Sequence, residues 1–150
     1  MKIAFVGIQR KFSEIASEYL DKFIQYHLEF PYYYARDGKN DVFITTVDHE
    51  SFPFKFEGGG SLRCVLDDRL EDHGPFDVVV HWRKWFDDLY QGDGALNVLH
   101  TCDHTYAETW KKTVVDEFCN GKLHGILGYP TWHKHNLFME LDGALPIEHL

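Results

Sequence analysis

Two neighbouring residues have side chains that could act together in acid–base chemistry. Asp103 and His104 follow an apolar run that ends at Thr101. A carboxylate that orients an imidazole tunes it for proton transfer near neutral pH, so this pair is a candidate catalytic pair. A structural role is the alternative, because Asp103 could equally cap a helix that begins near Tyr106.

Polar and basic residues also follow the other apolar runs, and they suggest a site for an anion. The predicted substrate- or phosphate-binding residues are Gly7, Arg10, His81, Thr131, His133 and Lys134. Helix N-termini that point at the same sheet edge would add partial positive charge. We therefore expect a phosphate or diphosphate there, although these residues could also be ordinary solvated loop residues.

A metal centre is not predicted. His100, Asp103 and His104 are metal-ligand types, but their spacing matches no strict ligand pattern. A metal-dependent hydrolase built on these three residues is therefore only a third alternative. We expect no metal and no bound cofactor.

Composition limits the class of protein. The 150 residues include 15 Lys and Arg against 24 Asp and Glu, giving a formal charge of -9. This acidity argues against a general nucleic-acid binder. The three cysteines form no C-x-x-C pair, as is typical of free thiols in a reducing cytoplasm. No apolar run approaches the ~20 residues of a membrane span, so we predict a cytoplasmic protein without a transmembrane segment.

The candidate residues are positioned by alternating apolar runs and helical patterns. Unalternated apolar runs predict strands at residues 2–6, 41–47, 77–82, 96–101 and 124–129. Residues 52–56 suit a short edge strand. Helical spacing predicts helices at residues 12–30, 62–70, 83–90 and 131–141, and one more that opens at Thr105 and ends at Gly121. Pro31 is expected to stop the first helix, and residues 142–150 are expected to be a tail.

This alternation predicts an α/β fold for residues 1–150 as a single domain. We expect a Rossmann-like three-layer α/β/α sandwich, with a mostly parallel sheet of strand order 3-2-1-4-5-6. The sequences G-x-G-x-x-G, G-x-x-x-x-G-K-[ST] and G-x-S-x-G are all absent. Their absence argues against an NAD dehydrogenase, a P-loop NTPase and an α/β-hydrolase.

Four segments follow one another in an order that resembles a known enzyme family. They read Met-Lys-Ile-Ala-Phe-Val, Phe-Asp-Val-Val-Val, Val-Leu-His-Thr-Cys-Asp-His and Gly-Tyr-Pro-Thr-Trp-His-Lys-His, and Leu-Pro-Ile-Glu comes after them. Together they resemble the N-terminal half of retaining GT-B-fold glycosyltransferases. That family implies two Rossmann-like domains facing across a cleft. The N-terminal domain mainly holds the acceptor, and the C-terminal domain holds most of the nucleotide-sugar donor.

The resemblance implies the acceptor-side domain of a glycosyltransferase, inactive on its own, with the second domain absent from this chain. Its partners would be a sugar or glycan acceptor and either the missing domain or a second copy bound to an exposed apolar face. By position, His104 or His81 matches the family's histidine near the acceptor, and Lys134 or Arg10 could meet phosphate. The first loop departs from the family, because Ile8 and its neighbours replace a Gly-Gly pair. A stand-alone Rossmann-like nucleotide- or sugar-binding module without catalysis is the alternative.

Overall fold

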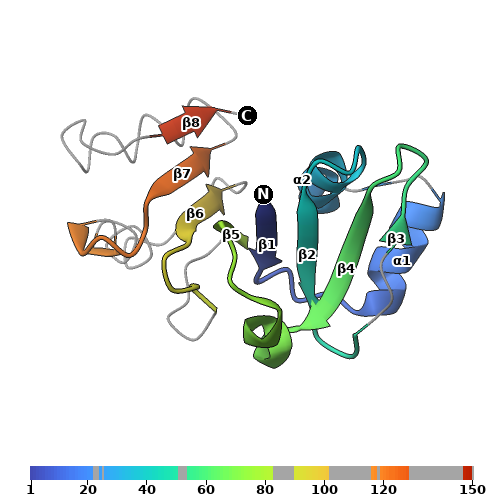
Figure 1. The fold of residues 1–150 in the computed structure, drawn as a ribbon, viewed down its shortest axis with the longest axis horizontal. Coiled ribbons are helices and arrows are strands. Elements are labelled where there is room, and N and C mark those ends of the chain that lie inside the picture. The colour runs from blue at the N-terminus through green and yellow to red at the C-terminus, as the bar shows by residue number, and fades with distance from the viewer. Residues whose placement is uncertain are drawn as a thin grey trace.

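A mostly parallel β-sheet forms the centre of the molecule in the computed structural model (Figure 1). The structure describes residues 1–21, 24, 26–50, 54–82, 90–101, 116–117, 119–128 and 147–149. In this part of the chain the strands are β1 (Lys2–Val6), β2 (Asp41–Thr46), β3 (Phe54–Lys55), β4 (Ser61–Leu66), β5 (Val78–Trp82), β6 (Leu96–Thr101), β7 (Gly125–Gly128) and β8 (Ile147–His149). Their order is β3-β4-β2-β1-β5-β6-β7-β8, and only the β3–β4 pair is antiparallel. The predicted α/β class with a mostly parallel sheet is confirmed.

Each face of the sheet has its own apolar core. Helices α1 (Phe12–Asp21) and α2 (Tyr26–Ala35) cover one face, where Ile15 and Leu28 pack with Phe5 and Ile44. The 3₁₀ helix η1 (Asp67–His73) lies on the other face, where its Leu70 joins a second cluster of buried residues. Burial on both faces explains the unalternated apolar runs of the sequence. No helix among the described residues has the length and apolar character needed to cross a bilayer.

The strand order differs from the predicted one, and the segment after residue 60 is the main reason. Residues 62–70 were expected to be helical, but β4 takes up the first half of this segment and η1 the second. β4 pairs in parallel with β2, and the short strand β3 pairs with β4 as the predicted edge strand. Leu62 and Cys64 are fully buried beside Val42 and Ile44, while Arg63 is exposed. This alternation is that of a strand.

Two further predictions about element boundaries are wrong. The single helix expected at residues 12–30 is two helices, and Pro31 lies inside α2 instead of ending it. The Pro31 side chain is buried, so packing offsets the backbone hydrogen bond that proline cannot donate. Part of the expected tail is a strand, because β8 pairs with β7.

Gly121 ends a helix as predicted. Its φ is +73°, and the amide of Lys122 donates to the carbonyl of Glu117 at 3.0 Å, as in a glycine-ended helix C-terminus. Most of that helix lies outside the described residues. So do the helices predicted at residues 83–90 and 131–141, apart from Tyr90.

Candidate functional site

The sheet changes its direction of winding between β1 and β5. From β1 the chain moves outward through β2 to β4, and it then returns to β5 on the other side of β1 (Figure 1). In open α/β sheets, ligands bind outside the carboxyl ends of the strands at such a point. The candidate site therefore lies between the turn that follows β1 and the segment that follows β5.

The turn after β1 is sharp and well anchored. Gly7 has a φ of +81°, in the region that favours glycine, and Gln9 follows with a φ of +52°. Ile8 between them is buried, while Gln9 is exposed. A residue other than glycine in this region carries backbone strain, which occurs often at functional sites. The turn thus presents the Gln9 amide at the carboxyl edge of the sheet.

Carboxylates of the chain itself occupy the N-terminus of α1. The Asp48 Oδ1 atom accepts the backbone N–H groups of Phe12 at 2.8 Å and His49 at 3.0 Å. The Glu14 Oε2 atom accepts the N–H of Lys11 at 3.0 Å. The backbone hydrogen bonds from Phe12 and Lys11 are the main cause that lowers the pKa of Asp48 and Glu14, respectively. This helix start already holds two anionic groups, so it attracts a phosphate less than a free one would.

Arg10 is held by acidic side chains of α1. Its Nη2 atom lies 2.7 Å from a Glu18 carboxylate oxygen, and its Nε atom lies 3.3 Å from Glu14. Only 23% of the Arg10 side chain is exposed. To bind phosphate, as the sequence predicts, Arg10 would have to exchange these partners.

His81 lies inside the sheet and not at its open edge. It is fully buried in β5, with its Nε2 atom 3.0 Å from the Oδ1 atom of Asn97 on β6. Burial lowers the pKa of His81 to about 4, against a smaller opposing effect of the Asn97 hydrogen bond. The imidazole is therefore neutral at physiological pH, and it joins two strands.

His100 is a second buried histidine near the carboxyl edge. Its ring stacks on Trp82, with the centroids 4.4 Å apart and an interplanar angle of 10°, and it also contacts Phe30. Neither ring nitrogen has a hydrogen-bond partner among the described residues. Burial lowers the pKa of His100 to about 4. The sequence singled out His100 only as a possible metal ligand, and no group of three or more metal-ligating side chains occurs in the described part of the chain.

The structure brings together only part of the predicted site. Gly7 and Arg10 share the first turn, and His81 pairs with Val6 just before that turn. The rest of the predicted site lies outside the described residues, namely Asp103, His104, Thr131, His133 and Lys134. Gln9 was not among the predicted site residues, and its place next to Gly7 in a loop after a buried strand was the one available signal.

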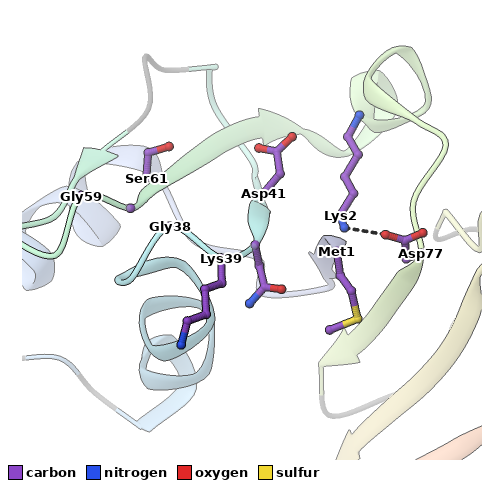
Figure 2. A pocket seen from close by; sticks show the side chains of 10 residues that line it. Met1, Lys2, Gly38, Lys39, Asp41, Gly59, Ser61 and Asp77 are labelled. Atoms are coloured by element: carbon purple, nitrogen blue, oxygen red, sulfur yellow. Dashed lines mark hydrogen bonds between the residues drawn. The ribbon is translucent and has the colours of Figure 1, made fainter.

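A second hollow lies at the opposite, amino ends of the strands (Figure 2). Its volume is about 530 Å³. Figure 2 shows the backbone amide of Lys2 donating to the Asp77 carboxylate, at 2.7 Å, with Asp41 nearby. Lys39 adds a further positive charge to the rim. Because its charges are mixed and it is far from the winding reversal, this hollow is not the candidate site.

Comparison with known proteins gives no further identification. No protein family, no curated protein and no solved structure matches this chain. Its class is therefore defined by the fold, as an α/β protein with a mostly parallel sheet whose winding reverses between β1 and β5.

Proposed function

We propose that the chain is the acceptor-side domain of a glycosyltransferase that uses a nucleotide-sugar donor, on a Rossmann-like fold. The reversal of winding between β1 and β5 is the observation that carries this proposal. Without the antiparallel β3 and the last strand, the order is β4-β2-β1-β5-β6-β7. This is the order of doubly wound sheets that bind nucleotides or sugars at the reversal.

The chemistry of the first turn supports an acceptor better than a donor. A nucleotide sugar carries a diphosphate, and the basic side chain and helix start nearest this turn already hold carboxylates. A sugar acceptor is neutral and offers hydroxyl groups, which the exposed Gln9 amide can bind by donating and accepting hydrogen bonds. The first turn would thus orient an acceptor hydroxyl.

In the proposed reaction the acceptor hydroxyl attacks the anomeric carbon of the donor as the nucleoside diphosphate leaves. Holding the hydroxyl in line with that carbon is the main task of this domain. In the proposal Asp103 and His104 handle the proton, while Thr131, His133 and Lys134 face the leaving phosphates. The donor-binding domain would come from elsewhere, so the chain alone is inactive. A cytoplasmic location and association through an apolar face belong to the same proposal.

An NMR titration of backbone amides tests this assignment. Mono- and disaccharides should shift the amide signals of Gly7, Ile8 and Gln9 more strongly than nucleoside diphosphates do. Gln9→Gly removes the amide side chain without backbone strain and should weaken sugar binding about tenfold. The matched control is Lys39→Ala at the amino edge, where the side chain is 81% exposed; it should leave sugar binding unchanged.

Two outcomes would contradict the proposal. If nucleoside diphosphates shift these amides and sugars do not, the chain is better described as a nucleotide-binding module. If the purified chain transfers sugar from a nucleotide donor by itself, its assignment as half of an enzyme is wrong. Radiolabelled transfer to a panel of acceptors measures the second outcome directly.

A further inference from the structure

An apolar cavity of about 190 Å³ lies between the sheet and α2. Strands β1, β5 and β6 line it with Phe5, Val80 and Val98, and α2 lines it with Phe30 and Tyr34. An engineered apolar cavity of about 150 Å³ stays dry and binds benzene. The cavity of this chain is therefore large enough for a six-membered ring.

One polar side chain interrupts the apolar wall. His100 lines the cavity, is 2% exposed, and has no hydrogen-bond partner on either ring nitrogen among the described residues. A neutral imidazole offers one donor and one acceptor, and burying both without partners destabilises the fold. A water molecule would be a poor partner, because buried water usually needs two to four polar contacts and His100 is the only polar side chain lining the cavity apart from the Tyr34 hydroxyl.

The cavity is accessible from the surface. Met1 and Tyr34 line it and are 65% and 37% exposed, respectively. A small molecule could therefore reach the buried part without unfolding of the sheet. The cavity lies beneath α2 and is separate from the turn that presents Gln9.

We propose that this cavity binds a small aromatic molecule with one hydroxyl group, of the size of phenol. Its ring lies among the Phe5, Phe30 and Val80 side chains, and its hydroxyl bonds to a ring nitrogen of His100. This ligand satisfies the buried imidazole and fills apolar space at the same time. The proposal is independent of the sugar site.

Phenol and benzene are the probes for this proposal. Both should raise the melting temperature of the wild-type protein, since a ligand that binds only the folded state stabilises it. Phenol should bind about tenfold more tightly than benzene, which corresponds to one additional hydrogen bond. Titration calorimetry with each compound measures this ratio.

Three variants separate the two parts of the proposal. His100→Leu should remove the preference for phenol and keep benzene binding. Val98→Phe should fill the cavity and abolish binding of both compounds. Leu96→Phe is the matched control, because Leu96 lies on the same strand and face, is 55% exposed and does not line the cavity; it should bind both compounds like the wild type.

Each remaining outcome overturns the proposal. Failure of both compounds to bind wild-type protein at millimolar concentration would mean that the cavity is not a ligand site. Equal affinities for phenol and benzene would exclude a role for His100. Phenol binding that persists in Val98→Phe would place the compound elsewhere.

Discussion

His81 and His100 lie on neighbouring strands but on opposite faces of the sheet. His100 pairs in register with Trp82, so it shares a face with α1 and α2, and His81 points to the other face. Both are buried, and burial lowers the pKa of both to about 4. They differ in their contacts, because His81 has a hydrogen bond to Asn97 and His100 has only aromatic neighbours.

This difference separates a structural histidine from one that is open to a ligand. Desolvation affects the two rings equally, so the protonation state does not distinguish them. The hydrogen bond ties His81 into the β5–β6 pair, whereas His100 pays for burial without a polar contact among the described residues. The same residue type thus has two roles, and the nearest side chain decides between them.

Acidification should produce the largest effect on this pair of histidines. Both have a folded pKa of about 4 against a model value of 6.5, so the unfolded chain binds more protons between these pH values. Stability is therefore highest above pH 6.5 and falls as the pH drops toward 4, by about 3 kcal/mol for each histidine. Urea unfolding at a series of pH values measures this loss.

Single variants show how much each histidine contributes to this pH dependence. His100→Phe and His81→Phe should each remove about one proton from the uptake on unfolding near pH 5. The carboxylates of Glu14 and Asp48 do not interfere, because their lowered pKa values place their effect below about pH 4.5. Equal pH dependence in wild type and both variants would contradict the buried, neutral state of the two rings.

Removing the partner of His81 should have the next largest effect. Asn97→Leu leaves the His81 Nε2 atom buried without this hydrogen bond, at a cost of about 2 kcal/mol in unfolding free energy. The double variant His81→Phe with Asn97→Leu should regain part of this loss, because both polar partners are then apolar. A double-mutant cycle from urea unfolding gives the coupling, and a value near zero would show that the bond contributes nothing.

Local sequence patterns predicted the strands that are buried on both faces. β6 was predicted with its observed bounds, and β1 was too, because continuous apolar runs are typical of parallel strands. β4 could not be recognised in this way. Leu62, Leu66 and Leu70 have helical spacing, and only pairing with β2 makes residues 61–66 a strand. Packing likewise overrides the expected helix stop at Pro31.

The candidate site was predictable in its location but not in its contacts. Parallel strands place Gly7 and His81 near one edge of the sheet by topology alone. The sequence does not show that Glu18 and Glu14 hold Arg10, since the first lies two helical turns away from it. Nor does it show that Asn97 faces His81 and that no described polar group faces His100. Such contacts depend on the register between strands, which no local pattern encodes.

One substitution made at both histidines should have effects of opposite sign, although each is small. His100→Phe removes buried nitrogens that have no described partner and keeps an aromatic ring against Trp82, so it should stabilise the protein by about 1 kcal/mol. His81→Phe leaves the Asn97 Oδ1 atom without its partner and should destabilise the protein by about the same amount. Urea unfolding at neutral pH measures both variants. If His100→Phe destabilises the protein as much as His81→Phe does, then His100 has a polar contact in the folded state, and the contrast between the two faces of the sheet is wrong.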